Sequence, residues 1–264
     1  MEHLEGRVAV ITGGGSGIGL GMAEAFAGQG MHVVLADLDA DRLDRARPQV
    51  EAAGPGQVLT VPTDVSDPAA VDELARRTMD AFGAVHVLCN NAGVSTLGYQ
   101  WETPLDDWHW LLGVNLFGVV HGIRSFTPHL VAQDEAHVVN TASMGGLITS
   151  AGSAPYSASK HAVVGLTKAL RAELAIRSGH VGVSVLCPGE VATNIADGIR
   201  TKGTERDVAR IDALRQRLTT AMPPIEVGQL VVDAIRQRQF WILPNGAAHL
   251  AAVRAEMDEL FSTS

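Results

Sequence analysis

Short apolar runs alternate with longer amphipathic segments along most of the chain. The short runs are rich in Val, Ile and Leu, which is typical of strands buried on both faces of a parallel sheet. The longer segments repeat their apolar positions at helical spacing, so we expect helices on both faces of that sheet. The pattern predicts an α/β fold with a doubly wound, seven-stranded parallel sheet, whose strands we place at residues 7–12, 32–37, 57–62, 86–90, 137–141, 182–187 and 240–243.

The segments between these runs predict helices, several of which begin at an Asp or Ser cap or at a proline. Pro48 lies inside the second helix and lacks a backbone N–H, so we expect that helix to kink or restart there. The predicted helices span residues 18–29, 39–53, 67–82, 105–131, 154–177 and 225–238.

Two stretches fit the alternation less well. Residues 190–224, called the flap below, have weak periodicity and a charged centre, which indicates either a mobile segment over a site or a plain surface excursion. Residues 247–261 predict a helical tail that closes over a site or forms a solvated cap. No repeat or linker divides the chain, so we expect one domain over residues 1–264.

Composition narrows the choice of partners. The 264 residues carry a formal net charge of −9 at pH 7, which repels nucleic-acid phosphates and anionic lipids and favours a small-molecule partner. The chain has no leading basic and apolar segment and no run of about 18 apolar residues, so we expect a cytoplasmic protein without a membrane partner. Its two cysteines and ten histidines lack the spacing of metal ligands, and we predict no metal site.

A glycine-rich segment follows the first predicted strand: residues 12–19 read TGGGSGIG. A dinucleotide-binding fold needs glycines there, because the backbone turns tightly and approaches a diphosphate; a tight turn alone is the other interpretation. Asp37 ends the next strand, where a carboxylate would bind the adenosine ribose hydroxyls and repel a 2′-phosphate. No Arg or Lys lies in the loop, so we favour NAD over NADP, with Arg42 as the nearest residue that argues otherwise.

Tyr156 and Lys160 lie one turn apart on a predicted helix that begins near Pro155. An ammonium group close to a phenol favours the phenolate and lowers a pKa that is ordinarily about 10, which would make Tyr156 a general base. The chain has only two tyrosines and three lysines, so chance is a poor explanation of this spacing. Without the glycine-rich segment, a pair on a helix surface would be an equally good interpretation.

Residues 7–193 resemble the short-chain dehydrogenase/reductase family, whose members have the Rossmann fold. The matching motifs comprise the glycine motif, an aspartate, an Asn-Asn-Ala-Gly sequence, an asparagine, a serine, the Tyr-x-x-x-Lys pair, a Pro-Gly pair and a threonine. In this chain they are Gly13, Gly17 and Gly19, Asp64, residues 90–93, Asn115, Ser143, Tyr156 and Lys160, Pro188 and Gly189, and Thr193.

The resemblance implies roles for four side chains. Tyr156 would be the general acid or base, and Ser143 would hydrogen-bond the substrate oxygen. Lys160 would bind the nicotinamide ribose and lower the pKa of Tyr156, while Asn115 would hold a water that connects Lys160 to solvent. Taken singly, Ser143 could be a hydroxyl at a strand end, and Asn115 a helix residue bonded to backbone.

The resemblance also implies a set of cofactor-binding residues, with Thr193 placed to bind the carboxamide. The set is Gly13, Gly15, Ser16, Gly17, Ile18, Gly19, Asp37, Asp64, Val65, Asn91, Ala92, Gly93, Tyr156, Lys160, Pro188, Gly189, Val191 and Thr193. With the strand order of the family, Cys89 and Cys187 are separated by one strand, which is too far for a disulfide.

Mostly apolar residues are expected around the substrate, which favours a medium-sized hydrophobic secondary alcohol or ketone. They are Ser95, Thr96, Leu97, Tyr99, Met144, Leu147, Ile148, Ile195 and Ile199. Glu190 would contact substrate or face water. The chain lacks the glycine-rich end that many members of the family pack against a neighbouring subunit. In the family, however, the helices that correspond to residues 105–131 and 154–177 usually form a bundle shared between subunits, so the resemblance implies a homodimer or homotetramer.

The sequence thus predicts an NAD-dependent oxidoreductase that interconverts a hydrophobic secondary alcohol and its ketone by hydride transfer. Three alternatives stay open: an NADPH-dependent carbonyl or 3-oxoacyl reductase, a non-catalytic nucleotide-binding subunit, and a methyltransferase that uses the same glycine-rich turn.

Overall fold

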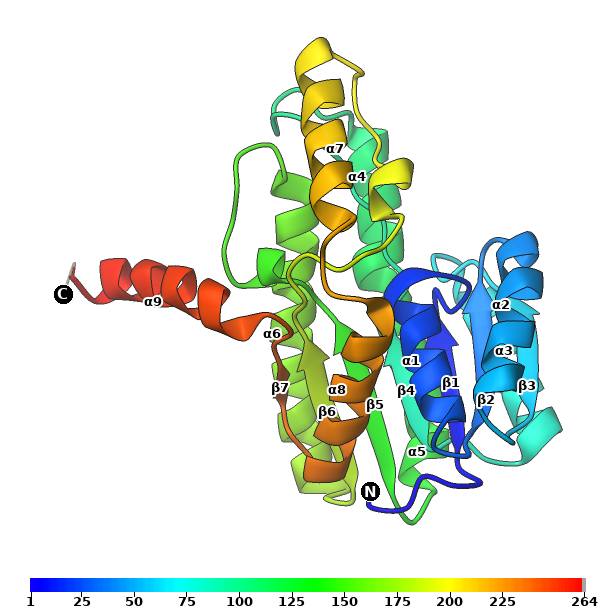
Figure 1. Cartoon of the computed structure of the whole chain (residues 1–264). Helices are drawn as coiled ribbons and strands as arrows, with labels where there is room; N and C mark the ends of the chain where they lie inside the picture. Colours follow the sequence, from blue (N-terminus) through cyan, green and yellow to red (C-terminus); the bar gives the residue numbers. More distant parts are fainter. Residues whose placement is uncertain (263–264) are drawn as a thin grey trace.

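A computed structural model of the chain describes residues 1–262, apart from the side chains of residues 247–249, 259 and 260. Within these residues one sheet holds seven parallel strands in the order β3-β2-β1-β4-β5-β6-β7, which confirms the doubly wound fold (Figure 1). The last strand has two residues rather than the four expected. The strands are β1 Val8–Thr12, β2 His32–Asp37, β3 Val58–Pro62, β4 Val87–Asn90, β5 Ala136–Thr141, β6 Val181–Leu186 and β7 Trp241–Ile242.

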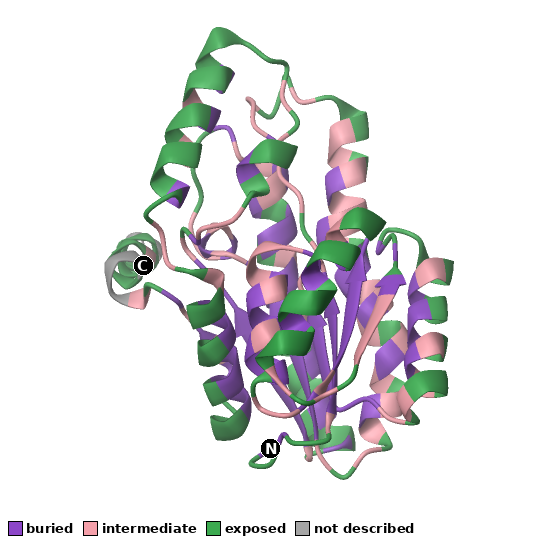
Figure 2. Cartoon of the chain, turned by 45° about the vertical axis from the view of Figure 1, so that its right-hand side comes forward, coloured by how far each residue is buried: buried purple, intermediate pink, exposed green. Residues whose placement is uncertain are grey.

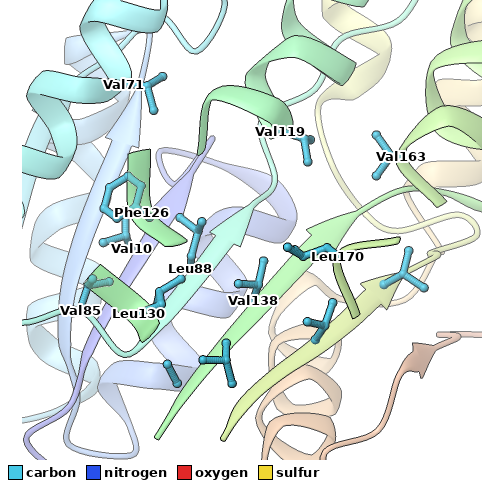
Figure 3. Close-up of a cluster of buried hydrophobic side chains, with 14 of the residues drawn as sticks. Val10, Val71, Val85, Leu88, Val119, Phe126, Leu130, Val138, Val163 and Leu170 are labelled. Carbon is cyan, nitrogen blue, oxygen red and sulfur yellow. The ribbon is translucent and has the colours of Figure 1, made fainter. Parts of the chain in front are cut away.

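Helices pack on both faces of the sheet, and each face has its own core. Alternate side chains of a strand point to opposite faces, so in β1 Val10 enters one core and Ile11 the other. Figure 3 shows the first core, where Phe126 and Leu130 lie over Val10 and Leu88. The main helices are α1 Gly17–Ala27, α2 Ala40–Ala53, α3 Pro68–Phe82, α4 Leu105–Leu112, α5 Gly118–Val131, α6 Ala154–Arg177 and α8 Pro224–Gln237.

Two helix predictions need correction. The helix expected over residues 105–131 is divided by a π-helical turn, η1 Gly113–Phe117, which separates α4 from α5. The expected restart at Pro48 is wrong, because α2 runs unbroken through it. A proline removes only one intrahelical hydrogen bond, and the buried face of α2, formed by Leu43, Ala46 and Val50, supports the helix on both sides of that gap.

The flap contains a helix that its weak periodicity did not indicate. A short 3₁₀ turn, η3 Ile195–Gly198, precedes α7 Glu205–Leu218, which stands above the sheet (Figure 1). Only a few apolar residues of α7 are buried, and they pack with neighbouring loop residues in a small separate cluster, while its outer face is exposed (Figure 2). That cluster consists of Leu97, Ala196, Ile199, Ile211, Leu214 and Leu218.

The helical tail is present as α9, Gly246–Ser262. It extends away from the rest of the molecule and is largely exposed (Figures 1 and 2). Of its described side chains, Val253 packs against the core, whereas Met257 and Phe261 are exposed. No helix in the described part of the chain is long and apolar enough to cross a membrane.

Two buried histidines make the fold sensitive to acid. His86 Nδ1 accepts a hydrogen bond from Val8 N at 3.1 Å, and His137 Nε2 lies 2.7 Å from Ser184 Oγ. Burial lowers the pKa of His86 to about 4 and that of His137 to about 3. In the unfolded chain both histidines have pKa values near 6.5. Between about pH 6.5 and pH 4 the unfolded state therefore binds these protons and the folded state does not.

The free energy of unfolding is therefore expected to fall as pH drops from about 6.5 towards 4. Urea unfolding at about pH 7 and about pH 5 measures this loss. His86→Asn keeps an acceptor for Val8 N without the titration, so its loss between the two pH values should be smaller. An equal loss in both proteins would exclude His86 as a source of the acid sensitivity.

Candidate active site

The glycine-rich loop joins β1 to α1 in a conformation that requires its glycines. Gly13 and Gly17 have φ values of +65° and +54°, in the left-handed region. A Cβ on Gly19 would lie 2.1 Å from the carbonyl oxygen of Gly13, so no side chain fits there. Ser16 is the N-cap residue of α1, yet its side chain makes no capping hydrogen bond. The first N–H groups of α1 therefore have no side-chain partner from Ser16, and their role in binding a diphosphate stays a prediction.

Asp37 lies directly beside this loop at the end of β2. Its Oδ2 accepts a hydrogen bond from Gly15 N at 3.1 Å, and its Oδ1 accepts one from Asp39 N at 3.1 Å. The residue is 9% exposed. Each carboxylate oxygen can accept a further bond, so the arrangement fits two ribose hydroxyls.

The ends of β1, β4 and β5 are tied together by a network that the sequence did not reveal. Thr12 Oγ1 accepts hydrogen bonds from Asn91 N at 2.9 Å and from Ala92 N at 3.1 Å. The amide of Asn91 donates to Thr12 O at 3.1 Å, and its Oδ1 accepts from Thr141 Oγ1 at 3.2 Å. Thr12 begins the glycine-rich segment, but its bonds to the loop after β4 were not expected, and Thr141 lies at a strand end where no motif distinguishes it.

Tyr156 and Lys160 lie in the first turns of α6, beside the end of β5. Lys160 is 3% exposed, and its Nζ donates to Thr141 O at 2.9 Å. The same nitrogen lies 5.8 Å from the centroid of the half-buried Tyr156 ring. A Cβ on Gly93 would lie 3.5 Å from this Nζ, so the predicted cofactor loop passes close to the ammonium group.

Ser143 completes this group from the loop after β5. It is the N-cap residue of a 3₁₀ turn, η2 Met144–Gly146, and its Oγ accepts a hydrogen bond from Gly145 N at 3.0 Å. Because this bond uses a lone pair, the hydroxyl proton is available for another acceptor. The predicted trio of Ser143, Tyr156 and Lys160 is thus brought together at one end of the sheet.

The pKa of Tyr156 does not follow the sequence-based expectation. Burial raises the pKa of the phenol, and a hydrogen bond with Ser143 opposes that rise only in part. Burial also lowers the pKa of Lys160 to about 8, so its positive charge weakens just above neutral pH. Desolvation therefore outweighs the stabilisation of phenolate that we expected from the ammonium group.

Asn115 lies fully buried in the π-helical turn, and its side chain bonds to the loop after β4 and to α6. Its Oδ1 accepts from Val94 N at 2.8 Å, and its Nδ2 donates to Val94 O at 3.0 Å and to Ser159 Oγ at 3.2 Å. Ser159 Oγ donates in turn to Tyr156 O at 2.7 Å. The side chain therefore connects the loop after β4 with α6, which agrees with the alternative of a backbone-bonded residue; the water-holding role stays a prediction.

The segment after β6 forms the opposite wall of the site. Met144 N donates to Pro188 O at 2.9 Å, which fixes the Pro-Gly pair beside the Ser143 loop. Thr193 Cγ2 would lie 3.1 Å from a Cβ on Gly17, so Thr193 faces the glycine-rich loop. A cleft of about 690 Å³ lies between the glycine-rich loop with α1 and the flap with the start of α8, and Ser143, Tyr156 and Lys160 do not line it.

Asp64 and Val65 have unequal surroundings. Asp64 is exposed, and its Oδ1 accepts from Ser66 N and Oγ at 2.9 and 2.7 Å. Val65 is buried, with its Cγ2 2.8 Å from the point where a Cβ on Gly118 would lie. Val65 thus packs against the start of α5. Its contact with the cofactor stays a prediction.

The expected substrate-pocket residues separate into two groups. Met144, Leu147 and Ile148 lie in the loop after β5, next to Ser143, and pack on the first core. Leu97 and Ile199 instead belong to the small cluster that holds α7. The flap is joined to the loop after β4 by backbone hydrogen bonds, from Leu97 N to Arg200 O at 2.9 Å and from Arg200 N to Ser95 O at 3.1 Å.

Two further expected residues contact α7. Tyr99 stacks on Trp101 with ring centroids 4.8 Å apart, and its hydroxyl accepts a hydrogen bond from Arg206 of α7. Glu190, the first residue of the flap, for which substrate and solvent contact stood open, forms an ion pair with Arg217 of α7 at 2.7 Å. The first contact links the flap to the loop after β4, and the second lies within the flap.

Thiols and metal ligands are not part of this geometry. Cys89 and Cys187 are both buried and free, in β4 and after β6, with β5 between them. Burial raises the pKa of both thiols, that of Cys187 to about 12. Among the described residues, no three His, Cys, Asp or Glu side chains are grouped to hold a metal ion.

Comparison with known proteins agrees with this geometry. Residues 7–204 match the family described as short chain dehydrogenase. A 1-deoxy-11-beta-hydroxypentalenate dehydrogenase from Streptomyces exfoliatus is 38% identical over 98% of this chain and 90% of that protein. A short chain dehydrogenase/reductase from Burkholderia phymatum, solved in complex with NAD, is 42% identical over 100% of this chain and 97% of that one, with a TM-score of 0.94.

A 3-ketoacyl-(acyl-carrier-protein) reductase from Brucella melitensis, complexed with NADH, is more distant. It is 28% identical, with a TM-score of 0.78 over 91% of this chain and 96% of that one. The family match and the similarity over the whole chain lead to one conclusion: the chain belongs to the short-chain dehydrogenase/reductase family and is an oxidoreductase that acts on CH–OH groups.

Proposed function

We propose that this enzyme interconverts a hydrophobic secondary alcohol and its ketone with NAD, and that Tyr156 is the general acid and base. The main support is the grouping of Tyr156, Lys160 and Ser143 at the end of β5, next to Gly93 of the predicted cofactor loop. A proton-transferring phenol, a buried cation and a serine hydroxyl that can donate to the substrate oxygen are the groups that hydride transfer at a CH–OH carbon requires.

In alcohol oxidation, Tyr156 accepts the hydroxyl proton while Ser143 donates a hydrogen bond to the same substrate oxygen. Lys160 supplies a positive charge near the phenol and a donor for a ribose hydroxyl. When bound, nicotinamide supplies the hydride acceptor. In ketone reduction the proton moves from Tyr156 to the developing alkoxide. The raised pKa of Tyr156 keeps the phenol protonated at neutral pH, which suits it to be the acid in that direction.

NAD is favoured over NADP by the surroundings of the ribose site. Asp37 is fixed by Gly15 N and Asp39 N in a position where its charge would repel a 2′-phosphate. The similar proteins from Burkholderia phymatum and Brucella melitensis were solved with NAD and NADH. Together these observations support NAD as the cofactor of this enzyme.

An apolar substrate is favoured by the loop that carries Ser143. Met144, Leu147 and Ile148 lie there, so the carbon skeleton next to the reacting oxygen would contact aliphatic side chains. The similar enzyme from Streptomyces exfoliatus is named for a hydroxypentalenate. We infer a hydrophobic secondary alcohol as the substrate class.

The test is NADH formation with a panel of hydrophobic secondary alcohols near pH 9, compared with NADPH formation. Wild type should prefer NAD, and Asp37→Ala should reduce the preference roughly 10- to 100-fold, because it removes acceptors for two ribose hydroxyls and a charge that repels phosphate. Asp41→Ala, in the exposed first turn of α2, is the matched control and should keep the preference. An unchanged NAD/NADP ratio in Asp37→Ala would exclude this carboxylate as the selector, and absence of turnover across the panel would contradict the proposed reaction.

A further inference from the structure

Arg42 lies at the edge of the ribose site although no motif singles it out. It is in the first turn of α2, and its Cβ lies 2.9 Å from the point where a Cβ on Gly15 would be. Oδ2 of Asp37 lies 2.9 Å from that same point. The side chain of Arg42 therefore starts next to the carboxylate that we propose binds the ribose. A guanidinium group in such a place has the charge and the planar donors that a phosphate requires.

Asp39 holds Arg42 at two atoms. Its Oδ2 lies 3.3 Å from Arg42 Nε, and its Oδ1 accepts a hydrogen bond from Arg42 N at 3.2 Å as the N-cap of α2. The two side chains are 42% and 43% exposed. An ion pair this exposed contributes little free energy, so the guanidinium can exchange Asp39 for a stronger anion when one is bound nearby.

We propose that Asp39 is a second determinant of cofactor choice, which acts by engaging Arg42, a latent ligand for an adenosine 2′-phosphate. The two carboxylates then have different tasks. Asp37 binds the ribose hydroxyls and repels phosphate, whereas Asp39 occupies the cation that would otherwise attract it. This inference rests on the proposed NAD site and explains how an arginine beside that site is compatible with NAD.

The experiment measures the Kd of NADH and NADPH by fluorescence for wild type and four variants. Asp39→Asn removes the charge but keeps an oxygen that can cap α2. Asp37→Ser/Asp39→Asn also removes the ribose selector, and the third variant adds Arg42→Ala to this pair. Arg45→Ala in the double variant is the matched control, because Arg45 is an exposed arginine on the same helix.

Asp39→Asn should tighten NADPH binding several-fold, and Asp37→Ser/Asp39→Asn about 10- to 100-fold, as expected for a new charge-assisted contact with phosphate. Adding Arg42→Ala should remove most of that gain, whereas adding Arg45→Ala should leave it. If Asp37→Ser/Asp39→Asn does not fold, Asp39→Asn with and without Arg42→Ala gives the same comparison.

One result would contradict the inference about Asp39 and Arg42, and another would contradict the proposed function. Tight NADH binding by wild type, together with an NADPH affinity that does not depend on Arg42 in any background, would overturn this inference and leave the proposed function intact. Failure of wild type to bind NADH would overturn the proposed function and, with it, the assignment of Arg42.

Discussion

The Tyr156→Phe variant is expected to lose about 100- to 10,000-fold in kcat/KM while its affinity for NADH stays close to that of the wild-type protein. Only the phenolic oxygen is removed, so the packing of the ring over Gly145 is kept and the proton has no acceptor. Steady-state rates with an alcohol substrate, and NADH binding by fluorescence, measure the two quantities separately. A loss below about 10-fold would mean that another group moves the proton.

Tyr99→Phe is the matched control, since Tyr99 is the second of the two tyrosines and its hydroxyl is bound to Arg206 of the flap. Its loss in kcat/KM should be smaller than that of Tyr156→Phe by at least about 10-fold.

The pH profile of alcohol oxidation gives a further check. Because the pKa of Tyr156 is raised, alcohol oxidation by wild type should increase with pH up to at least about pH 9, and this increase should disappear in Tyr156→Phe.

A large loss of stability is expected for Gly228→Ala, where α8 crosses α1. A Cβ on Gly228 would lie 2.2 Å from the carbonyl oxygen of Gly21 and 2.7 Å from its carbonyl carbon. These are backbone atoms of a buried helix, so α1 and α8 must separate to accept the methyl group. Overpacking of this kind costs about 3 kcal/mol, which lowers Tm by roughly 10 °C in a protein of this size.

Gly165→Ala provides the control, because Gly165 lies within α6 and a Cβ there would meet no atom within 4 Å. This variant should gain about 0.5–1 kcal/mol from the better helix propensity of Ala. Thermal unfolding of both variants and the wild-type protein measures the difference. Equal Tm values for Gly228→Ala and the wild-type protein would mean that the two helices can move apart at little cost.

The sheet and the helices that cover it could be predicted because burial on both faces leaves a clear apolar pattern. Val8–Thr12 is fully buried, and its sequence is apolar except at the last position. α7 could not be predicted in the same way, since few of its residues are buried and the rest of the helix is polar. The π-helical turn was also missed, because it shifts the apolar spacing by one residue at a single place in a long amphipathic stretch.

The candidate site could be predicted where its chemistry lies in local motifs. Tyr156 and Lys160 are four residues apart, and the glycine-rich segment is continuous, so both are visible in the sequence. Partners that meet only through the fold were not visible. Thr141 O accepts a hydrogen bond from Lys160 only because the fold brings β5 next to α6. Asp39 pairs with Arg42 only in the side-chain conformation that the structure shows. The direction of the Tyr156 pKa shift depends on burial, which a motif does not report.

The π-helical turn also limits the length of the chain between α4 and α5. Each residue of a helix advances its side chain by about 100°, since a turn takes 3.6 residues. Deleting one residue from Gly113–Phe117 would leave a regular α-helix with α4 and α5 in their present orientation, whereas inserting one would rotate α4 against α5 by that angle. Leu111 and Phe126, both buried now, could then not face the interior together. The segment is therefore already at the greatest length that its two helices accept, and an insertion there should lower soluble yield more than a deletion does.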